Sequence, residues 1–271
     1  MGRRLIYIKP AAPAYNPLTL AWIAATLETD TTILNALNTF EAGLDANSLK
    51  PKFTAIYPMV GGDAARHARN FINTALYTLS FNGFWTHSAT GALPNGVNAN
   101  ASTGILGSNL TVNSNHISFY SRTNAAVAAK PSIGLFQSPL ALLLYLKGSG
   151  AGTAVYTNSS TALATMYPSG VSTDSRGWFI GNKASNAIGG LTISKNGTSL
   201  ASNLASPNQT AYPNLPVLIS GNSIGGPIVY DDKECAMVTI GTSLTSGEIS
   251  TLYTLIQAFQ TNLNTTPPRQ V

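Results

Sequence analysis

Cysteine and charge are both scarce in this chain. One cysteine, Cys235, occurs in 271 residues, which excludes an intramolecular disulfide framework and a zinc site built from several cysteines. Cys235 lies in the apolar run CAMVTIG, which predicts a buried and inert thiol. Charged residues make up 9% of the chain, against about 25% in an average domain. Neutral polar residues replace them, a composition typical of β-rich extracellular or virion proteins.

Membrane-spanning runs are also missing. The apolar run LALLLYL at 140–146 is about a third of the ~20 residues that a spanning helix needs, and it predicts a strand buried on both faces. Arg3 and Arg4 precede an apolar stretch, as in a signal peptide, but Lys9 and Pro10 interrupt it early. We therefore expect neither a membrane span nor a secretory signal.

Positive charge is in excess but is not clustered. The net charge is +5, yet Arg3 and Arg4 form the one adjacent basic pair, and Arg66 and Arg69 are three positions apart. A nucleic-acid surface needs a basic stripe interleaved with aromatic residues. We expect no nucleic-acid partner.

Residues 1–52 differ in pattern from the rest. The stretch IKPAAPAYNP is rich in proline and predicts an extended arm. Asp30 then caps a predicted helix over 31–46, whose apolar residues recur at helical spacing. That stripe must pack on the main domain or on the same helix of a second subunit. We expect an anchoring or oligomerising segment, a homo-oligomer with a trimer favoured, and a sandwich that still folds without residues 1–50.

The remainder, 53–271, has a β pattern. Short apolar or alternating runs are separated by turn clusters, and Asn196-Gly197 between two such runs predicts a hairpin. Many strands at regular spacing indicate a sandwich or jelly roll. Thr245 and Glu248 form a capping box that begins a C-terminal helix.

The segment DDKECAMVTIGTSLTSGEISTLY resembles the closing segment of laminin G-like domains. In those domains a last strand runs into a helix that begins Leu-Thr/Ser-x-x-Glu-Ile, matched here by Leu244, Thr245, Glu248 and Ile249. The resemblance implies an all-β, concanavalin A-like (laminin G-like) β-sandwich or jelly roll, with an N-terminal arm and helix and a C-terminal helix.

A second resemblance covers about residues 20–271. The segments AIYPMVGG, FNGFWTHSATGALPNGVNANAST, NSNHISFYSRTN and DSRGWFIGN look like virion proteins of phages that infect Bacteroidetes-type bacteria. The run NANAST departs from a more usual Gly-Tyr-Ala-Asp-Thr-like run. The resemblance implies a non-enzymatic spike, fibre or head-decoration subunit on the virion surface. Its partners would be other virion proteins, bound through the N-terminal segment, and a host surface glycan.

Two other functions stay open. A secreted bacterial lectin-like adhesin would share the fold, and so would a polysaccharide-degrading enzyme. Glycoside hydrolysis needs two carboxylates about 5–9.5 Å apart, and Asp232 and Glu234 alternate beside a strand, about 7 Å apart on one face. Because Lys233 lies between them, we expect the two carboxylates to be solvated surface groups and not a catalytic pair.

The run FNGFWTHSATGALPNG at 81–96 invites a catalytic interpretation. By strand alternation Trp85 points into the sandwich, which predicts core packing. His87 precedes Ser88, but no Gly-x-Ser-x-Gly elbow surrounds that serine. We expect a structural histidine and a turn at GALPNG.

Metal binding has no recognisable motif. His67, His87 and His116 are far apart in sequence and show no paired spacing. A calcium ion held by Asp63 or Asp174 with loop carbonyls would suit the fold, but no motif supports it. We assign no metal, no cofactor and no catalytic residue.

Carbohydrate contact is the remaining chemistry. Sugar sites in sandwiches use exposed aromatic residues together with polar loop residues. The candidate ligand-binding residues are Tyr120, Arg122, Trp178 and Asn182. Trp178 and Ile180 should share one face of their strand, so one aromatic of the Trp178–Phe179 pair belongs to the core.

Overall fold

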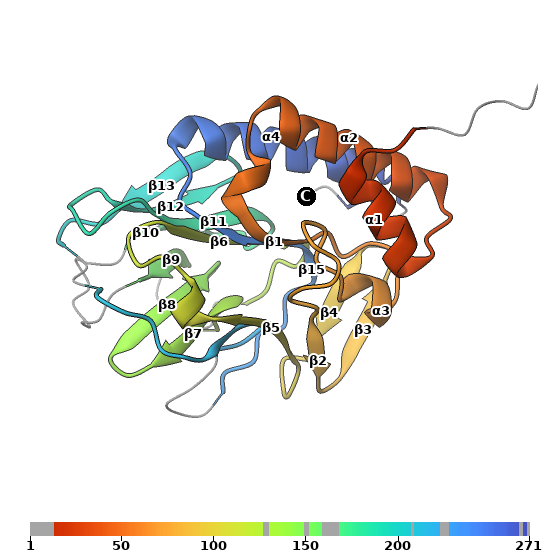
Figure 1. Ribbon diagram of the computed structural model, residues 1–271. Coiled ribbons are helices and arrows are strands. Elements are labelled where there is room, and N and C mark those ends of the chain that lie inside the picture. The colour runs from red at the N-terminus through yellow and green to blue at the C-terminus, as the bar shows by residue number, and fades with distance from the viewer. Residues whose placement is uncertain are drawn as a thin grey trace, which may run out of the picture.

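The computed structural model describes residues 14–126, 130–148, 152–158, 168–206, 209–222, 228–265 and 268–269. Two antiparallel sheets pack face to face, and helices cover the outer face of one of them (Figure 1). The predicted β-sandwich is therefore confirmed. Within the described ranges, no helix is both long enough and apolar enough to span a membrane.

The first sheet has eight strands in the described chain. Their order is β13-β12-β11-β6-β15-β4-β3, and β1 pairs with β15. The strands are β1 (Phe53–Tyr57), β3 (Trp85–Ser88), β4 (Gly91–Pro94), β6 (Asn115–Ser121), β11 (Gly177–Lys183), β12 (Leu191–Lys195), β13 (Thr198–Ser202) and β15 (Cys235–Gly241). Strand β1 of this sheet begins at Phe53, and Asn196-Gly197 forms the predicted hairpin between β12 and β13.

The second sheet has seven strands in the described chain, in the order β10-β9-β8-β7-β14-β5-β2. They are β2 (Ser80–Asn82), β5 (Asn100–Leu106), β7 (Ile133–Gln137), β8 (Leu140–Tyr145), β9 (Thr153–Thr157), β10 (Ser169–Val171) and β14 (Pro216–Ile219). The predicted strand over 140–146 corresponds to β8, whose four central residues are buried.

Strand alternation divides the interior into two cores. Phe179 of β11 points between the sheets, whereas Trp178 and Ile180 point toward the helices. Both aromatic residues are fully buried, where the sequence predicted only one in the core. Cys235 lies in the core between the sheets, and burial raises the pKa of its thiol far above the usual value.

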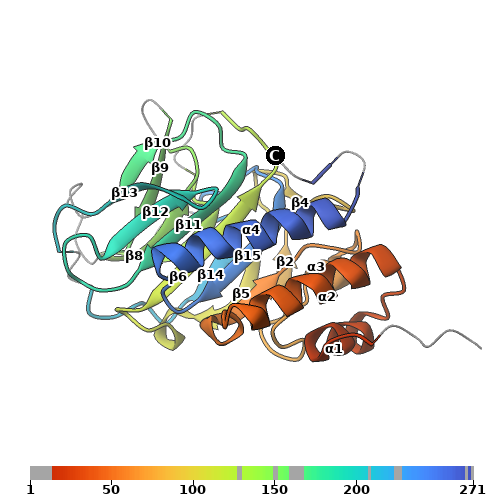
Figure 2. The same ribbon diagram turned by 90° about the horizontal axis from the view of Figure 1, so that it is seen from above.

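The helices are α1 (Pro17–Thr26), α2 (Thr31–Ala46), α3 (Ala64–His67) and α4 (Ser246–Asn262), with short 3-10 turns at Lys50–Lys52 and Gly107–Asn109. Helices α2 and α4 run side by side over the first sheet (Figure 2). The predicted caps are present, because Asp30 accepts from the N–H of Thr32 at 2.8 Å and Thr245 and Glu248 cap each other.

The apolar stripe of α2 packs inward. Leu37 and Phe40 are buried, and the Phe40 ring lies 5.3 Å from that of Phe259 on α4. Of the two alternatives that the sequence left open, packing on the main domain is the one observed. The trimer stays a prediction, and this stripe is not free to form it.

Helix α1 was not predicted from the sequence. Its apolar residues show no clear amphipathic pattern, and tertiary contacts hold it. The buried carboxylate of Glu41 accepts from the N–H groups of Leu18 and Thr19, each at 2.9 Å, which satisfies the start of the helix. Trp22 is fully buried and its ring meets that of Phe71 edge-on. The rest of the predicted extended arm, up to residue 13, lies outside the described residues.

Candidate functional site

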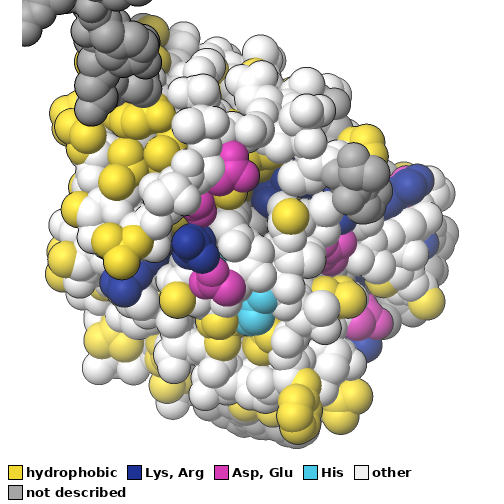
Figure 3. Space-filling model, turned by 90° about the vertical axis from the view of Figure 1, so that its right-hand side faces the viewer, with side chains coloured by type: hydrophobic (Ala, Val, Ile, Leu, Met, Phe, Trp, Pro, Cys, Tyr) yellow, Lys and Arg dark blue, Asp and Glu magenta, His cyan; other side chains and the backbone are white. Residues whose placement is uncertain are grey.

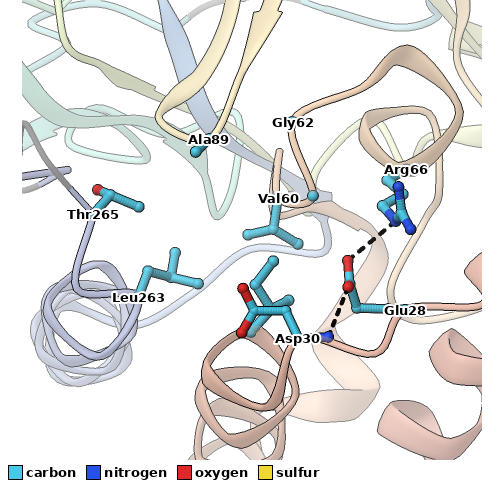
Figure 4. Close-up of a pocket in the computed structure, with 10 residues that line it drawn as sticks. Glu28, Asp30, Val60, Gly62, Arg66, Ala89, Leu263 and Thr265 are labelled. Atoms are coloured by element: carbon cyan, nitrogen blue, oxygen red, sulfur yellow. Dashed lines mark hydrogen bonds and ion pairs between the residues drawn. The ribbon is translucent and has the colours of Figure 1, made fainter.

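A pocket of about 320 Å³ opens where the start of α2, the end of α4 and the loop between β1 and α3 meet (Figure 4). Ile33, Val60 and Leu263 supply an apolar wall. Polar groups face this wall, and the polar lining residues are Glu28, Asp30, Arg66 and Thr265. The pocket therefore offers an apolar surface and a charged rim within one small volume.

Glu28 is held in place from two sides. One carboxylate oxygen accepts from the N–H groups of Thr29 at 2.9 Å and Asp30 at 3.0 Å. The other lies 3.1 Å from Nε of Arg66. The side chain is 6% exposed, so the geometry of this edge of the pocket is fixed before a ligand arrives.

Arg66 bridges two carboxylates. It forms ion pairs with Glu28 and with Asp63, the residue that caps α3. Burial by itself raises the pKa of Asp63, but hydrogen bonds from the backbone and guanidinium of Arg66 outweigh it and hold that pKa below its usual value. The hydrogen bond to Asp63 in turn raises the pKa of Arg66. Arg66 thus remains a cation at the pocket rim.

The loop under Arg66 requires glycine. Gly61 and Gly62 have φ of +90° and +75°, the left-handed region that other residues rarely adopt. A Cβ at Gly61 would lie 2.1 Å from Cδ of Arg66. The sequence GGD therefore lets the arginine side chain lie across the loop and reach Glu28.

Arg269, which does not itself line the pocket, connects segments that surround it. Its buried guanidinium donates to the side-chain oxygen of Gln260 and to the carbonyls of Pro58, Met59, Ala89 and Ala236, at 2.7–3.0 Å. Burial lowers its pKa to about 9, so it stays charged at neutral pH. Its hydrogen bonds connect the loop between β1 and α3, the β3–β4 turn and β15 with the C-terminal segment. No sequence motif indicated this residue.

A cluster of aromatic and imidazole rings connects α3 with strands β2 and β3. Phe81, Trp85 and His87 contact one another, and the Nδ1 atoms of His67 and His87 are 2.9 Å apart. His67 and His116 are buried and His87 is partly exposed. Figure 3 shows a face of the molecule on which a histidine side chain reaches the surface.

Strand β3 pairs with β4 (Gly91–Pro94), so the expectation of a turn at GALPNG is wrong for its first four residues. Trp85 is only partly buried and packs against the edge of the core between the sheets. Ser88 bonds to Thr90 and to the carbonyl of Gly91, not to His87, so this pair lacks the contact between nucleophile and base that a triad needs.

The predicted sugar-contacting aromatic residues are covered. Tyr120 and Trp178 have no exposed surface. Gln257 of α4 donates to the Tyr120 hydroxyl at 3.1 Å, and Tyr253 of α4 stacks on Trp178. The sequence-based prediction assumed that they are exposed, and this assumption is wrong because α4 covers their face of the sheet.

Arg122 and Asn182 also have protein partners. Arg122 pairs with Glu234 at 2.9 Å and donates to the Pro268 carbonyl. Asn182 accepts from the N–H of Leu244 at 2.7 Å and donates to its carbonyl at 3.0 Å. The four candidates therefore do not form one exposed site, although Asn182 does border a second pocket.

The carboxylates considered for catalysis are each paired with a cation. Asp232 lies 3.2 Å from Lys130, and Glu234 lies 2.9 Å from Arg122. Glu234 also accepts from the Thr90 hydroxyl at 2.6 Å. Both residues precede β15 and are not part of it.

Metal ligands do not gather in the described chain. The ranges that the structure describes contain no group of three or more His, Cys, Asp or Glu residues placed to hold an ion. The two carboxylates considered for calcium each pair with an arginine instead, Asp63 with Arg66 and Asp174 with Arg176.

Comparisons with known proteins bear on the fold. No protein-family model and no curated protein matches the chain. The Trypanosoma rangeli sialidase in complex with 2,3-difluorosialic acid is similar over 74% of this chain and 32% of its own, with 13% identity and a TM-score of 0.51. This chain spans about a third of that sialidase. At such identity the likeness supports the β-sandwich fold and nothing further.

Two weaker similarities have TM-scores below 0.5 and support no further argument. Domain 4 of AbnA, an extracellular arabinanase from Geobacillus stearothermophilus, in complex with arabinotriose, matches over 74% of this chain and 98% of its own, at 15% identity and a TM-score of 0.47. The botulinum neurotoxin serotype D binding domain matches over 77% and 53%, at 11% identity and a TM-score of 0.44.

Proposed function

We propose that this protein is a non-catalytic, carbohydrate-binding surface subunit of a phage particle, and that the pocket at Glu28, Asp30 and Arg66 contacts a host surface glycan. The pocket's combination of an apolar wall and a fixed charged rim carries the proposal. A sugar ring has an apolar C–H face and a hydroxyl edge. Ile33, Val60 and Leu263 suit the face, and the charged rim suits the hydroxyls through charge-assisted hydrogen bonds.

The size of the pocket is compatible with a sugar. Its volume of about 320 Å³ lies at the small end of the roughly 300–1,000 Å³ found for ligand sites. One sugar residue at the end or along the side of a glycan chain would fill such a space. Donors and acceptors that are held in place before binding also reduce the conformational entropy lost when a ligand binds.

The carboxylates of the pocket favour binding over hydrolysis. Glu28 accepts from two backbone N–H groups and faces Arg66, and Asp30 accepts from the N–H of Thr32. A glycosidase needs one carboxylic acid that remains protonated to serve the leaving group. Both carboxylates of this pocket already accept hydrogen bonds from backbone N–H groups, which suits a fixed binding surface.

The virion assignment is supported by the sequence resemblance alone. It proposes other virion proteins as partners and the particle surface as the location. Mass spectrometry of purified particles should find this chain, and an antibody against it should block adsorption to host cells. Its absence from purified particles would remove the virion part of the proposal and leave carbohydrate binding to be judged separately.

Glycan binding can be tested on the intact protein. A glycan array, followed by titration of the best glycan, should give a defined ligand. Asp30→Asn should weaken binding at least tenfold while keeping α2 capped, because asparagine is as good a cap as aspartate. Arg176→Gln, at an exposed ion pair elsewhere, is the matched control for loss of a charge.

Two results would contradict this assignment. One is an array without any bound glycan, and the other is a glycan whose affinity is unchanged by Asp30→Asn and by Arg66→Gln. Release of reducing ends from the bound polysaccharide, lost in Asp232→Asn or Glu234→Gln, would establish the enzymatic alternative instead.

A further inference from the structure

A second pocket lies at the opposite end of α4. It has a volume of about 250 Å³ and separates the start of α4 from the outer face of β11–β13. None of its lining residues is charged. They are Asn182, Ala184, Gly189, Gly190, Thr192, Ser194, Gly197, Ser199, Leu244, Thr245, Ser246 and Ile249.

Ser194 places a hydroxyl in this pocket. Ile193 points into the core between the sheets, so alternation along β12 turns Ser194 to the outer face, where the pocket lies. The residue is only 3% exposed. Within the described chain no side chain or backbone group bonds to its hydroxyl, so both the donor and the acceptor are left to a ligand in the pocket.

The start of α4 borders the same space. The first N–H groups of a helix have no intrahelical partner. Among them, the N–H of Glu248 donates to the hydroxyl oxygen of Thr245. The N–H group of Ser246, which lines the pocket, therefore remains for a ligand. The Glu248 carboxylate accepts from the N–H of Thr245 at 2.7 Å and forms an ion pair with Lys52 at 3.3 Å, so Lys52, the cation beside this terminus, is already paired and is not available to an anionic ligand.

Asn182 sets the geometry of the pocket. It bonds to both backbone groups of Leu244, and so holds the residue before the helix cap against β11. Its side-chain amide is used by these bonds, which makes it a positioning residue. Leu244 and Ile249 supply the apolar wall.

We propose that this pocket binds one uncharged, polyhydroxylated unit of a glycan chain, with the hydroxyls of Ser194 and Thr192 and the start of α4 as its partners. The proposal rests on the proposed glycan-binding function and adds a second subsite to it. The two pockets lie about 25 Å apart along α4, at 1.5 Å per residue from Ser246 to Leu263. They share no residue, so each is tested by itself.

The experiment is an NMR titration of the full-length protein. Glucose, galactose, mannose and N-acetylglucosamine are added separately, and the backbone amide signals are followed. At least one of these neutral sugars should shift the signals of Ser194, Gly190 and Ser246 in a saturable manner. Glucuronic acid and inorganic phosphate should shift them much less.

Three variants locate the effect. Ser194→Ala should weaken the neutral sugar at this pocket at least fivefold. Ser202→Ala removes the same hydroxyl from an exposed position on β13 outside the pocket, and it should leave the affinity unchanged. Asp30→Asn should also leave this site unchanged, so failure of the first pocket and failure of the second are distinguishable.

Three results would overturn the proposal. The first is that no neutral sugar shifts these amides. The second is that phosphate shifts them and the sugars do not, which would make the site an anion-binding helix terminus. The third is an equal affinity of the wild type and Ser194→Ala for the sugar that binds.

Discussion

The Nδ1 atoms of His67 and His87 lie 2.9 Å apart. One ring must donate and the other accept, so this contact requires at least one neutral imidazole. Burial lowers the pKa of His67 to about 3, with further lowering by His87 and Arg269, while Asp63 and a backbone hydrogen bond to Ser88 act in the opposite direction. The pair therefore holds α3 against β3 only while at least one of the two rings is neutral.

Acid should weaken the fold through this pair. The unfolded chain binds a proton on His67 below pH 6.5, whereas the folded chain does so only near pH 3. Stability is thus complete above about pH 6.5 and falls as pH decreases, by up to about 1.4 kcal/mol per pH unit for each such histidine. His116, whose pKa burial lowers to about 4, adds to the loss.

Urea titrations at pH 7.0, 6.0 and 5.0 measure this effect. His67→Gln should lose less stability than the wild type over the interval, because glutamine does not titrate. Fluorescence of Trp85, which stacks on His87, reports the same region. Equal losses in both proteins would show that the histidine pair does not govern acid stability.

Lys183 should act in the same direction, but at higher pH. It is fully buried, its Nζ lies 3.4 Å from Asn158 Oδ1, and burial lowers its pKa to about 8. Between pH 8 and 10.5 the unfolded chain holds the proton that the folded chain has released, so this lysine adds stability as pH rises.

Lys183→Met isolates that contribution. At pH 7 the variant should be more stable than the wild type, because a buried charge is gone. Its advantage should shrink as pH rises from 8 to 10. The difference between the two free energies of unfolding is the quantity to measure, since tyrosine and cysteine titration is common to both. A constant difference would contradict a buried, titrating lysine.

Removal of the Arg269 side chain should destabilise the fold. Arg269→Met leaves the carbonyls of Pro58, Met59, Ala89 and Ala236 without this donor, and loss of a buried charged partner of this kind costs about 3–5 kcal/mol. Chemical denaturation gives the value. Arg176→Met, at an exposed ion pair, is the matched control and should leave the unfolding midpoint unchanged. Similar midpoints for both variants would refute the proposed role.

The N-terminal helices should be needed for folding. Phe40 packs on Phe259, and Phe40→Ala should cost about 3–5 kcal/mol. Thr39→Ala, exposed on the same helix, should change stability by about 0.5 kcal/mol or less. A chain that lacks residues 1–50 should expose the helix-side core and aggregate. If that chain is soluble and unfolds cooperatively, the sandwich is independent of α1 and α2, as the sequence alone suggested.

Local signals determined much of the architecture. Strand alternation placed Phe179 and Trp178 on opposite faces of β11, and Asn196-Gly197 marked a hairpin, because both depend on neighbouring residues only. The cap of α2 by Asp30 and the box of Thr245 with Glu248 were equally predictable for that reason. Helix α1 was missed, since Glu41, more than twenty positions away, satisfies its first N–H groups.

The candidate sites depended on the tertiary structure. The sequence named Trp178 and Tyr120 as contact residues, but whether an aromatic face is open depends on which helix packs over it, and α4 covers both. The pockets join Glu28 to Arg66 and Ser194 to Ser246, pairs too distant in the chain for any periodicity to relate them. The sequence by itself thus determined the class of fold and its capped helices, through short-range preferences. Only the tertiary structure decided which polar groups remain available to a ligand, because that depends on long-range burial.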